Sequence, residues 1–278
     1  MDRPIPIPTS FDNHFTAGDG PASPQALAMT TTKPRVLLID IGGSNVKAMV
    51  SGSEEMRRFP SDRTLSATGM VEGVHKLTGD WRYDRVSIGF PGLVRDGAPV
   101  REPLNLGDGW LGFDFEKAFG APVRIINDSA LHALAAYQGG RMLFIGFGTS
   151  IGCGLVADGA ITTMEPGLIP LKSGQPYMER LCKSSLKERG TKRWSRVALE
   201  AITLLRDVFW AEDVVIGGGN AKHIDPFPEN CRRVSNRNAL RGAERLWPGS
   251  EMLAEPNGST WRIKEMDPLP KADQAAVG

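Results

Sequence analysis

Three glycine-rich turns, each next to an apolar run, constrain the fold of this chain more than any other feature. The first lies in LLIDIGGSNVKAMV (residues 37–50), the second is GFGTSIGCG (146–154), and the third is GGGN (217–220), which follows DVVI. An apolar run that ends at glycine is typical of a buried strand, and glycine lets backbone N–H groups approach an anion closely. Each turn alone is an ordinary connection at least as often as a ligand site. The three together favour a phosphate-binding α/β protein.

Strands and helices alternate along most of the chain. RVLLID and NVKAMV predict a hairpin, while DRVSIGF, VRIIND and RMLFIGF predict further strands. Residues 64–78 have a weak helical pattern, ALHALAAYQ is an Ala-rich helix that Asp128 or Ser129 could cap, and residues 194–210 are a long amphipathic helix. A hairpin with a glycine-rich turn occurs early and again near residue 145, which predicts two related α/β lobes.

Composition along the chain predicts four regions. Residues 1–34 are rich in Pro, Gly, Ser and Thr without a period, so we expect a disordered leader. Residues 248–278 are expected to form a flexible tail for the same reason. Between them we expect an N-terminal lobe at 35–126, on which a helix at 238–247 packs, and a C-terminal lobe at 127–237.

Charge and cysteine usage narrow the class of partner. The chain has 33 Lys and Arg against 32 Asp and Glu, a net charge of +1, so any binding of nucleic acid or membrane would have to be local. Its 3 cysteines are scattered and odd in number, which matches neither a disulfide framework nor a zinc site. No apolar run approaches the roughly 18 residues of a membrane span. We therefore expect a cytoplasmic protein with no nucleic-acid or membrane partner.

The first glycine-rich turn carries side chains suited to a phosphate. Gly42 and Gly43 expose their N–H groups, Asp40 could hold a Mg²⁺-bound water, and the Ser44 hydroxyl could bond a phosphate oxygen. Lys47 could add positive charge or face solvent. The residues that repeat this design in the two later turns are Gly148, Thr149, Gly217, Gly218 and Gly219.

Asp128 is the candidate catalytic residue. It ends a predicted buried strand and begins a helix, and ligands of α/β proteins bind at that rim of the sheet. A carboxylate there could act as a general base and take a proton from a hydroxyl group. Aspartate is also a good N-cap residue, and the two roles are compatible.

These stretches together resemble the ROK family of sugar kinases, repressors and related proteins, within the actin-like ATPase superfamily. DIGGSNVK, residues 40–47, is similar to the family's first phosphate motif, DxGGTxxK, with Ser44 keeping the hydroxyl of the usual Thr. The other segments that resemble family motifs are the GxPG turn at 89–92, the catalytic pair at 127–128, the second phosphate motif at 146–152 and the adenosine-side motif at 217–219.

Within the family the chain is most similar to polyphosphate glucokinases, because residues 175–202 resemble the helical insert of those enzymes in place of a zinc site. The resemblance implies an actin-like (ribonuclease H-like) α/β fold with two lobes around a cleft, no structural zinc site, and a homodimer. It implies phosphoryl transfer from polyphosphate or ATP to the 6-hydroxyl of glucose or a related hexose, with Mg²⁺ as cofactor. Asp128 would be the base, and Asn105, Asn127 and Glu165 match positions that contact sugar.

One family segment is altered. The E-x-G-H segment that binds sugar hydroxyls reads Glu165-Pro166-Gly167-Leu168, and leucine has neither donor nor acceptor. Leaving a buried group unpaired costs about 1–3 kcal/mol, so a sugar- or nucleotide-binding protein without turnover is the alternative. His132 falls in a predicted helix and is not expected to replace the missing histidine.

Two features bear on partners. The residues Lys183, Lys187, Arg189, Lys192, Arg193 and Arg196 are either a basic track for polyphosphate or a solvated helix face. Repressors of the family carry an N-terminal helix-turn-helix, and residues 1–34 are too short and too rich in Pro for one.

Overall fold

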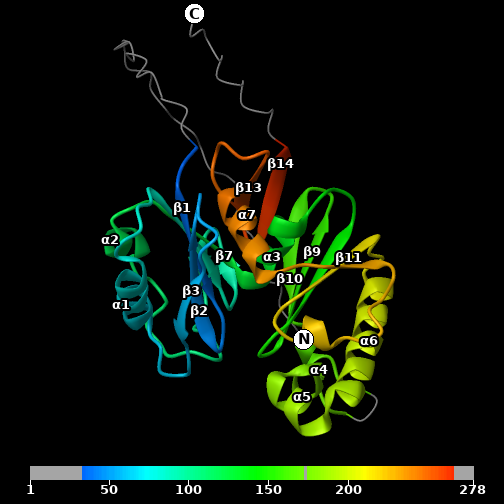
Figure 1. Cartoon of the computed structure of the whole chain (residues 1–278). Helices are drawn as coiled ribbons and strands as arrows, with labels where there is room; N and C mark the ends of the chain where they lie inside the picture. Colours follow the sequence, from blue (N-terminus) through cyan, green and yellow to red (C-terminus); the bar gives the residue numbers. More distant parts are fainter. Residues whose placement is uncertain (1–32, 172–173, 266–278) are drawn as a thin grey trace, which may run out of the picture. The chain divides into compact units, whose positions relative to one another are not determined.

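A computed structural model of the protein describes residues 33–171 and 174–265. The predicted leader at 1–34 therefore lies almost wholly outside the described residues. Two large sheets with helices packed against them, together with one two-stranded sheet, make up the described part (Figure 1). Among these residues no helix is long and apolar enough to cross a membrane.

The first sheet has five strands in the order β3-β2-β1-β4-β7. Their bounds are β1 (Val36–Ile41), β2 (Asn45–Val50), β3 (Arg57–Pro60), β4 (Arg85–Phe90) and β7 (Val123–Asn127). β1, β2 and β3 form an antiparallel meander, while β1, β4 and β7 are parallel. The predicted hairpin and the strands at 85–90 and 123–127 are confirmed.

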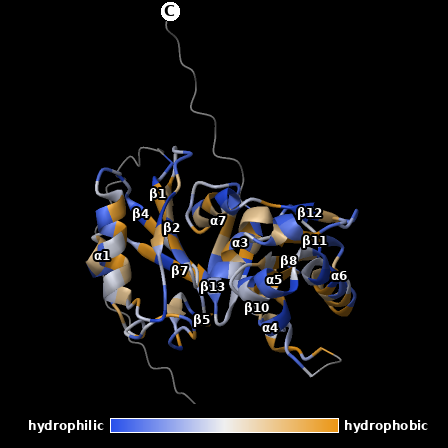
Figure 2. Cartoon of the chain, turned by 60° about the horizontal axis from the view of Figure 1, so that its bottom comes forward, coloured by the Kyte–Doolittle hydropathy of each residue, from blue (hydrophilic) through white to orange (hydrophobic). Residues whose placement is uncertain are grey.

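Burial explains why β1 is apolar at every position except Asp40. Every residue of β1 is buried, because a strand in the parallel part of a sheet is covered on both faces. Figure 2 shows much of β1 and β4 in the colour of hydrophobic residues. The helix α1 (Ala67–Thr78) packs on β2 and β3, and Ser66 caps it by accepting the N–H of Gly69. A short helix, α2 (Phe115–Phe119), contacts β7.

The second sheet has seven strands in the order β12-β11-β8-β9-β10-β14-β13. Their bounds are β8 (Met142–Phe147), β9 (Ile151–Ala157), β10 (Ala160–Met164), β11 (Asp213–Gly217), β12 (Cys231–Arg233), β13 (Met252–Asn257) and β14 (Thr260–Glu265). β8, β9 and β10 form an antiparallel meander, and β8, β11 and β12 are parallel. The plan of the first sheet is thus repeated, with the β13–β14 hairpin added at the β10 edge.

Three helices follow the second meander: α4 (Tyr177–Leu181), α5 (Lys183–Arg189) and α6 (Thr191–Val208). The predicted amphipathic helix at 194–210 corresponds to α6, which begins three residues earlier, at Thr191, and ends two residues earlier, at Val208. Its buried face includes Trp194, Ala198 and Leu205. Val208, at its last turn, is 60% exposed and lies off that face.

Two helices connect the sheets. α3 (Asp128–Ala136) contacts β4 and β7 of the first sheet and β8 and β9 of the second. α7 (Ala239–Glu244) packs on α3 and β1. A Cβ at Gly242 would overlap the carbonyl oxygen of Leu131, so glycine permits the close crossing of the two helices.

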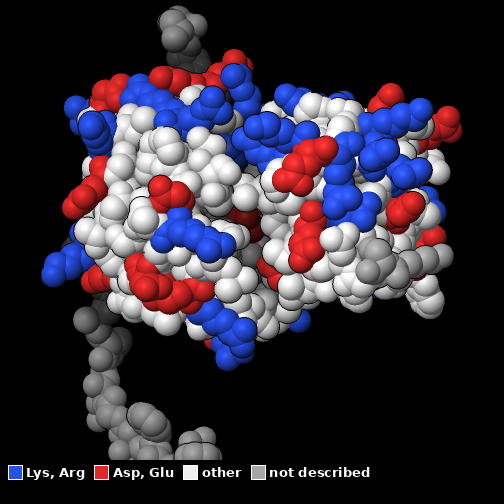
Figure 3. Space-filling model, turned by 90° about the horizontal axis from the view of Figure 1, so that it is seen from below, with Lys and Arg blue, Asp and Glu red and all other residues white. Residues whose placement is uncertain are grey.

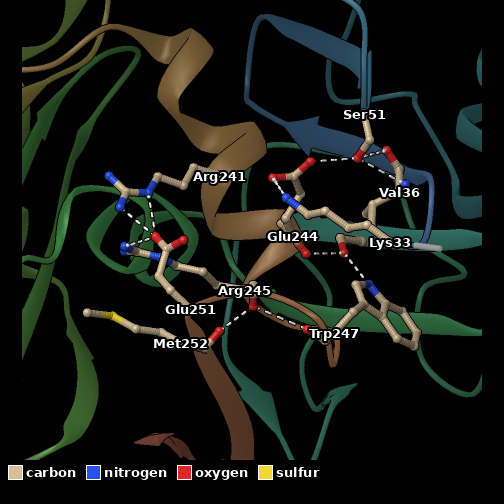
Figure 4. A network of polar contacts seen from close by, with 12 residues as sticks. Lys33, Val36, Ser51, Arg241, Glu244, Arg245, Trp247, Glu251 and Met252 are labelled. Atoms are coloured by element: carbon tan, nitrogen blue, oxygen red, sulfur yellow. Dashed lines mark hydrogen bonds and ion pairs between the residues drawn. The ribbon is translucent and has the colours of Figure 1, made fainter. Parts of the chain in front are cut away.

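Polar contacts hold α7 and the turn after it between the sheets (Figure 4). Glu244 accepts the Ser51 hydroxyl at 2.8 Å, beside the end of β2. The Trp247 indole N–H donates to the Ser87 hydroxyl on β4 at 2.9 Å. Arg245 is paired with Glu251 at 2.9 Å and also donates to the carbonyl oxygen of Tyr137. The predicted helix at 238–247 is therefore too long, because residues 245–247 form a turn that makes these contacts.

The predicted flexible tail at 248–278 is wrong for residues 252–265, which form β13 and β14. Loop-like composition hid an apolar face: Leu253, Ala254 and Trp261 are buried, and Trp261 pairs in register with Ile161 of β10. A short hairpin contacts this segment. Its strands are β5 (Val94–Arg95) and β6 (Ala98–Pro99), and the N–H of Asp96 in its turn donates to the Gly258 carbonyl at 2.8 Å. Residues 266–278 lie outside the described residues.

Candidate functional site

Asp40 lies near the end of β1, and strand register decides its neighbours. It pairs with Lys47 across the antiparallel β1–β2 ladder, and Lys47 Nζ lies 2.7 Å from Asp40 Oδ2. The side chain is nearly inaccessible, with the residue 5% exposed. Burial raises the pKa of Asp40, but the charges and hydrogen bonds of Lys47 and His132 outweigh it and hold that pKa well below its usual range. Asp40 is therefore a fixed negative charge.

His132 is a neighbour that the sequence analysis missed. Its Nε2 lies 3.8 Å from Asp40 Oδ2, and its ring stacks on Phe144 with centroids 5.4 Å apart. The residue does lie in a helix, as predicted, but that helix is α3, which begins at Asp128. The spacing was the available signal, because residues four apart share a helix face, so His132 follows Asp128 toward the site.

Asn127 is the N-cap of α3, which corrects the expectation that Asp128 or Ser129 caps it. Asn127 Oδ1 accepts the N–H groups of Ser129 at 2.9 Å and Ala130 at 3.2 Å. Its amide nitrogen donates to the carbonyl oxygen of Gly92 at 3.0 Å. Both ends of the Asn127 side chain thus fix the start of α3 against the turn at 89–92. Asp128 is the first helical residue, and its Oδ1 accepts the N–H of Ser129 at 2.7 Å.

Asp128 and Asp40 approach each other across Gly89. Register places Gly89 beside Asp40, and a Cβ at Gly89 would lie 3.7 Å from Asp40 Oδ1 and 3.6 Å from the Asp128 Cα. Burial raises the pKa of Asp128 to about 7, and the negative charge of Asp40 adds to that effect. His132 and the N–H of Ser129 oppose it. The result is a carboxyl group that can gain or lose a proton near neutral pH.

The first two glycine-rich turns meet. Ser44 Oγ lies 2.9 Å from Thr149 Oγ1, across the two sheets. A Cβ at Gly43 would lie 3.5 Å from Thr149 Cγ2 and 3.5 Å from Asn105 Cβ. The structure therefore brings Gly43, Ser44, Thr149 and Asn105 together.

The third turn is joined to the second. Gly217 pairs with Gly146 in the parallel β11–β8 ladder, so the two turns leave the sheet side by side. Gly218 has φ +86°, and a Cβ there would overlap the backbone of Phe147. Asn220 donates from its side chain to the Gly148 carbonyl at 2.9 Å. Asn220 was not among the predicted site residues, although it closes the GGGN stretch.

The remaining predicted sugar residues lie near this centre with fewer contacts. Glu165 is exposed and precedes a short 3-10 helix, Pro166–Leu168, and its charge contributes to the raised pKa of Asp128. Leu168 is 66% exposed. The position of the family histidine therefore presents an apolar side chain to the surface.

Chemically, the site combines a fixed carboxylate, a carboxyl group that titrates near neutrality, and glycine-rich turns with hydroxyl groups. These groups lie at the ends of parallel strands, where α/β proteins bind ligands. Figure 3 shows a hollow on one face of the molecule with Asp or Glu side chains at its floor. Two sheets of the same strand plan, with helices packed against them, confirm the predicted α/β class.

Residues 36–170 match the model of the ROK family. N-acetylmannosamine kinase of Escherichia coli O157:H7 is 31% identical over 148 residues, covering 48% of this chain and 50% of that protein. N-acetylmannosamine kinase of Shigella flexneri is 30% identical over 149 residues, covering 48% of this chain and 51% of that protein. The chain thus spans about half the length of the curated relatives it matches.

Solved structures share the fold over a longer part of the chain. An inorganic polyphosphate/ATP-glucomannokinase from Arthrobacter sp. strain KM has a TM-score of 0.65 and 21% identity, covering 76% of this chain and 97% of its own. A ROK family glucokinase from Streptomyces griseus, in complex with glucose and AMPPNP, has a TM-score of 0.62 and 17% identity, covering 76% and 98%. At these identities the likeness establishes the fold alone.

Proposed function

We propose that this chain is a sugar kinase that transfers a phosphoryl group from polyphosphate or ATP to the 6-hydroxyl of glucose or a related hexose. The observation that carries the proposal is the pair of carboxyl groups at Gly89. Asp40 is held ionised beside Lys47, while Asp128, across the same glycine, has a pKa raised to about 7. A base poised near the working pH is what abstraction of a hydroxyl proton requires.

Asp128 acts on the acceptor in this proposal. Its carboxylate accepts the proton of the sugar hydroxyl as the oxygen attacks phosphorus, and the bond from phosphorus to the donor oxygen breaks. Asn127 cannot move freely, because its two amide ends are bonded to Gly92 and α3. The base is therefore held in place before the substrate arrives, which favours reaction through orientation.

The glycine-rich turns act on the donor. Backbone N–H groups of Gly42, Gly43 and Gly148 and the hydroxyls of Ser44 and Thr149 would face the phosphoryl oxygens, where charge accumulates during transfer. Gly217, Gly218 and Gly219 would contact the donor beyond the transferred group. Ser44 Oγ and Thr149 Oγ1 are 2.9 Å apart, so the two hydroxyl groups are already close enough to face the same phosphoryl group.

Mg²⁺ fits the residues at this site. The ion prefers oxygen ligands and binds through one or two carboxylates together with substrate phosphates and waters. Asp40 supplies an ionised, nearly inaccessible carboxylate. Within the described ranges no three His, Cys, Asp or Glu side chains gather as a metal site, so the ion would be shared with the donor phosphates. Bound there, it would neutralise phosphate charge, and Asp40 would hold it through a water.

Acceptor identity is the open choice in the proposal. The curated relatives are named for N-acetylmannosamine, and the structural neighbours for glucose and glucomannokinase activity. Asn105, Asn127 and Glu165 are the residues that we propose to contact the sugar. With leucine at position 168, one polar partner is missing from that set. A glucose-type hexose is then the acceptor only if Asn105, Asn127 and Glu165 are sufficient to bind it.

Donor choice depends on a basic surface. Lys183, Lys187, Arg189, Lys192, Arg193 and Arg196 are all exposed on α5 and α6. Figure 3 shows Lys and Arg side chains gathered over this part of the molecule. In the described part of the chain none of the six is paired with a carboxylate, which supports a polyanionic donor such as polyphosphate over a solvated face. A homodimer in the cytoplasm completes the proposal.

The second candidate is a sugar- or nucleotide-binding protein of this fold without kinase turnover. Its support is Leu168, which is exposed and offers no hydrogen bond to a sugar. In that case the donor turns would bind a phosphate ligand, while the acceptor would not be held for attack.

The test is phosphorylation of glucose, mannose and N-acetylmannosamine with Mg²⁺, run with ATP and with polyphosphate. We expect turnover of at least one hexose, and a fall in kcat of about 10²- to 10⁴-fold in Asp128→Asn, because general-base catalysis contributes that much. Asp114→Asn is the matched control, since Asp114 caps α2 outside the site. A folded wild type that phosphorylates no hexose but binds donor in calorimetry would instead establish the second candidate.

A further inference from the structure

The segment at 102–111 is a closed loop held by one carboxylate. Glu102 Oε1 accepts the N–H of Gly109 at 3.2 Å and that of Leu111 at 3.5 Å, and Glu102 Oε2 accepts the N–H of Trp110 at 3.2 Å. Gly109 has φ +90°, a conformation that lets three successive N–H groups turn toward one side chain. Charge-assisted bonds of this kind are about twice as strong as neutral ones.

An aromatic anchor fixes the base of the same loop. Trp110 is 0% exposed and its ring lies 5.6 Å from that of Phe90, next to the turn at 89–92. The Trp110 indole N–H donates to the Gly107 carbonyl at 2.7 Å. The N–H of Gly107 donates to Leu65 at 3.0 Å, and a Cβ at Gly107 would lie 3.0 Å from the backbone of Thr64. These contacts anchor the base of the loop beside the turn at 89–92, on the side where the N–H groups bonded by Glu102 lie.

The tip faces the phosphate turn. Asn105 is exposed, and its Cβ lies 3.5 Å from the place where a side chain of Gly43 would begin. Leu104, beside it, is 88% exposed. Two backbone hydrogen bonds hold the stretch that contains residues 104 and 105. The N–H of Leu106 donates to the Pro103 carbonyl, and the N–H of Gly107 donates to the Leu65 carbonyl. The placement of Asn105 thus depends on how firmly the two ends of the loop are closed.

We propose that Glu102 is the positioning residue of the acceptor site: its carboxylate closes the loop at 102–111 and so holds Asn105 against the Gly43 turn. The inference rests on the proposed function, because it assigns the loop to the hexose. Glu102 acts through the backbone and does not touch the sugar. Its loss therefore weakens binding of the hexose and leaves the donor turns and Asp128 as they are.

The test compares Glu102→Ala and Glu102→Gln with the wild type in hexose phosphorylation. We expect KM for the hexose to rise about 10-fold in Glu102→Ala, since its bonds to three N–H groups are lost, while kcat and KM for the donor change less than about 2-fold. Glu102→Gln keeps the oxygen that accepts two of the three bonds, so its KM is expected to be intermediate. Hydrogen exchange at residues 109–111 is expected to quicken in the same order.

Glu116→Ala is the matched control. Glu116 also accepts a backbone N–H, that of Val123 at 3.1 Å, but at the start of β7, at the opposite end of the strand from Asp128. Its KM for the hexose is expected to match the wild type. An active wild type whose hexose KM is unchanged in Glu102→Ala would overturn this inference alone. A wild type that phosphorylates no hexose would overturn the proposed function, and with it the acceptor role of the loop.

Discussion

The donor turns and the acceptor loops of this site are built in different ways. The donor turns join hydrogen-bonded strands, so register fixes them: Asp40 lies opposite Lys47, and Gly146 lies between Gly152 and Gly217. The acceptor residues lie on irregular segments, and Asn105, Glu165 and Leu168 are all exposed. In the proposed function, phosphate binding would therefore depend mainly on backbone position, whereas choice of sugar would depend on single side chains. Three substitutions test that difference.

The largest effect is expected from Gly218→Ala. Gly218 has φ +86° and no room for a Cβ beside the backbone of Phe147, so alanine must move the turn. The left-handed backbone alone destabilises alanine by about 1–2 kcal/mol, and the steric overlap adds to that. We expect a Tm lower by at least several degrees and a large rise in KM for the donor. Thermal unfolding and donor titration measure the two effects.

Gly52→Ala is the control for that substitution. Gly52 lies in the turn after β2, away from the proposed donor turns, and also has a positive φ of +81°, but nothing lies within 4 Å of a Cβ there, so alanine is expected to leave donor KM near the wild-type value and to lower Tm less than Gly218→Ala. If both substitutions were equally harmless, the donor side would not depend on backbone position as argued above.

A smaller effect, an improvement in hexose binding, is expected from Leu168→His on the acceptor side. Leu168 is 66% exposed, so the exchange needs no repacking of the core. If the imidazole pairs a sugar hydroxyl, hexose binding improves by about 0.5–1.5 kcal/mol, or roughly 2- to 10-fold in KM. Leu204→His, at an exposed leucine of α6, is the control that should change nothing. An unchanged KM in Leu168→His would place the sugar away from this segment.

An effect of about the same size, but on the donor side, is expected from Ser44→Ala. The hydroxyl is 2.9 Å from Thr149 Oγ1, and its removal takes one neutral hydrogen bond from the donor side while the backbone turn remains. Donor KM should rise a few-fold, consistent with about 0.5–1.5 kcal/mol. Ser44→Thr should restore it, because the hydroxyl is kept. A loss as large as that of Gly218→Ala would mean that side chains, not backbone, hold the phosphate.

Sequence reasoning placed the glycine-rich turns and their strands well for a physical reason. Apolar runs that end in glycine identify both the strand and the turn, so Asp40, Gly43 and Gly218 could be placed without coordinates. Asp128 was found because it stands where a strand becomes a helix. Its capping role was misjudged, since Asn127 one position earlier makes those bonds.

Other features needed the fold. His132 reaches Asp40 only because α3 crosses from one sheet to the other, and Glu102 closes its loop through backbone N–H groups that any sequence could supply. The strands at 252–265 were read as a tail because Pro, Gly and Ser surround them. Their apolar face becomes visible only when Trp261 lies beside Ile161 of β10.

The most direct test of the account is the pH dependence of kcat for hexose phosphorylation. Burial and the charge of Asp40 raise the pKa of Asp128 to about 7, and only the deprotonated carboxylate can act as base. Activity should therefore be full above that pH and fall about tenfold per unit as the pH drops well below it. An acid limb near pH 7 would support Asp128 as the base. A rate that stays constant down to about pH 5, in protein that remains folded, would contradict it.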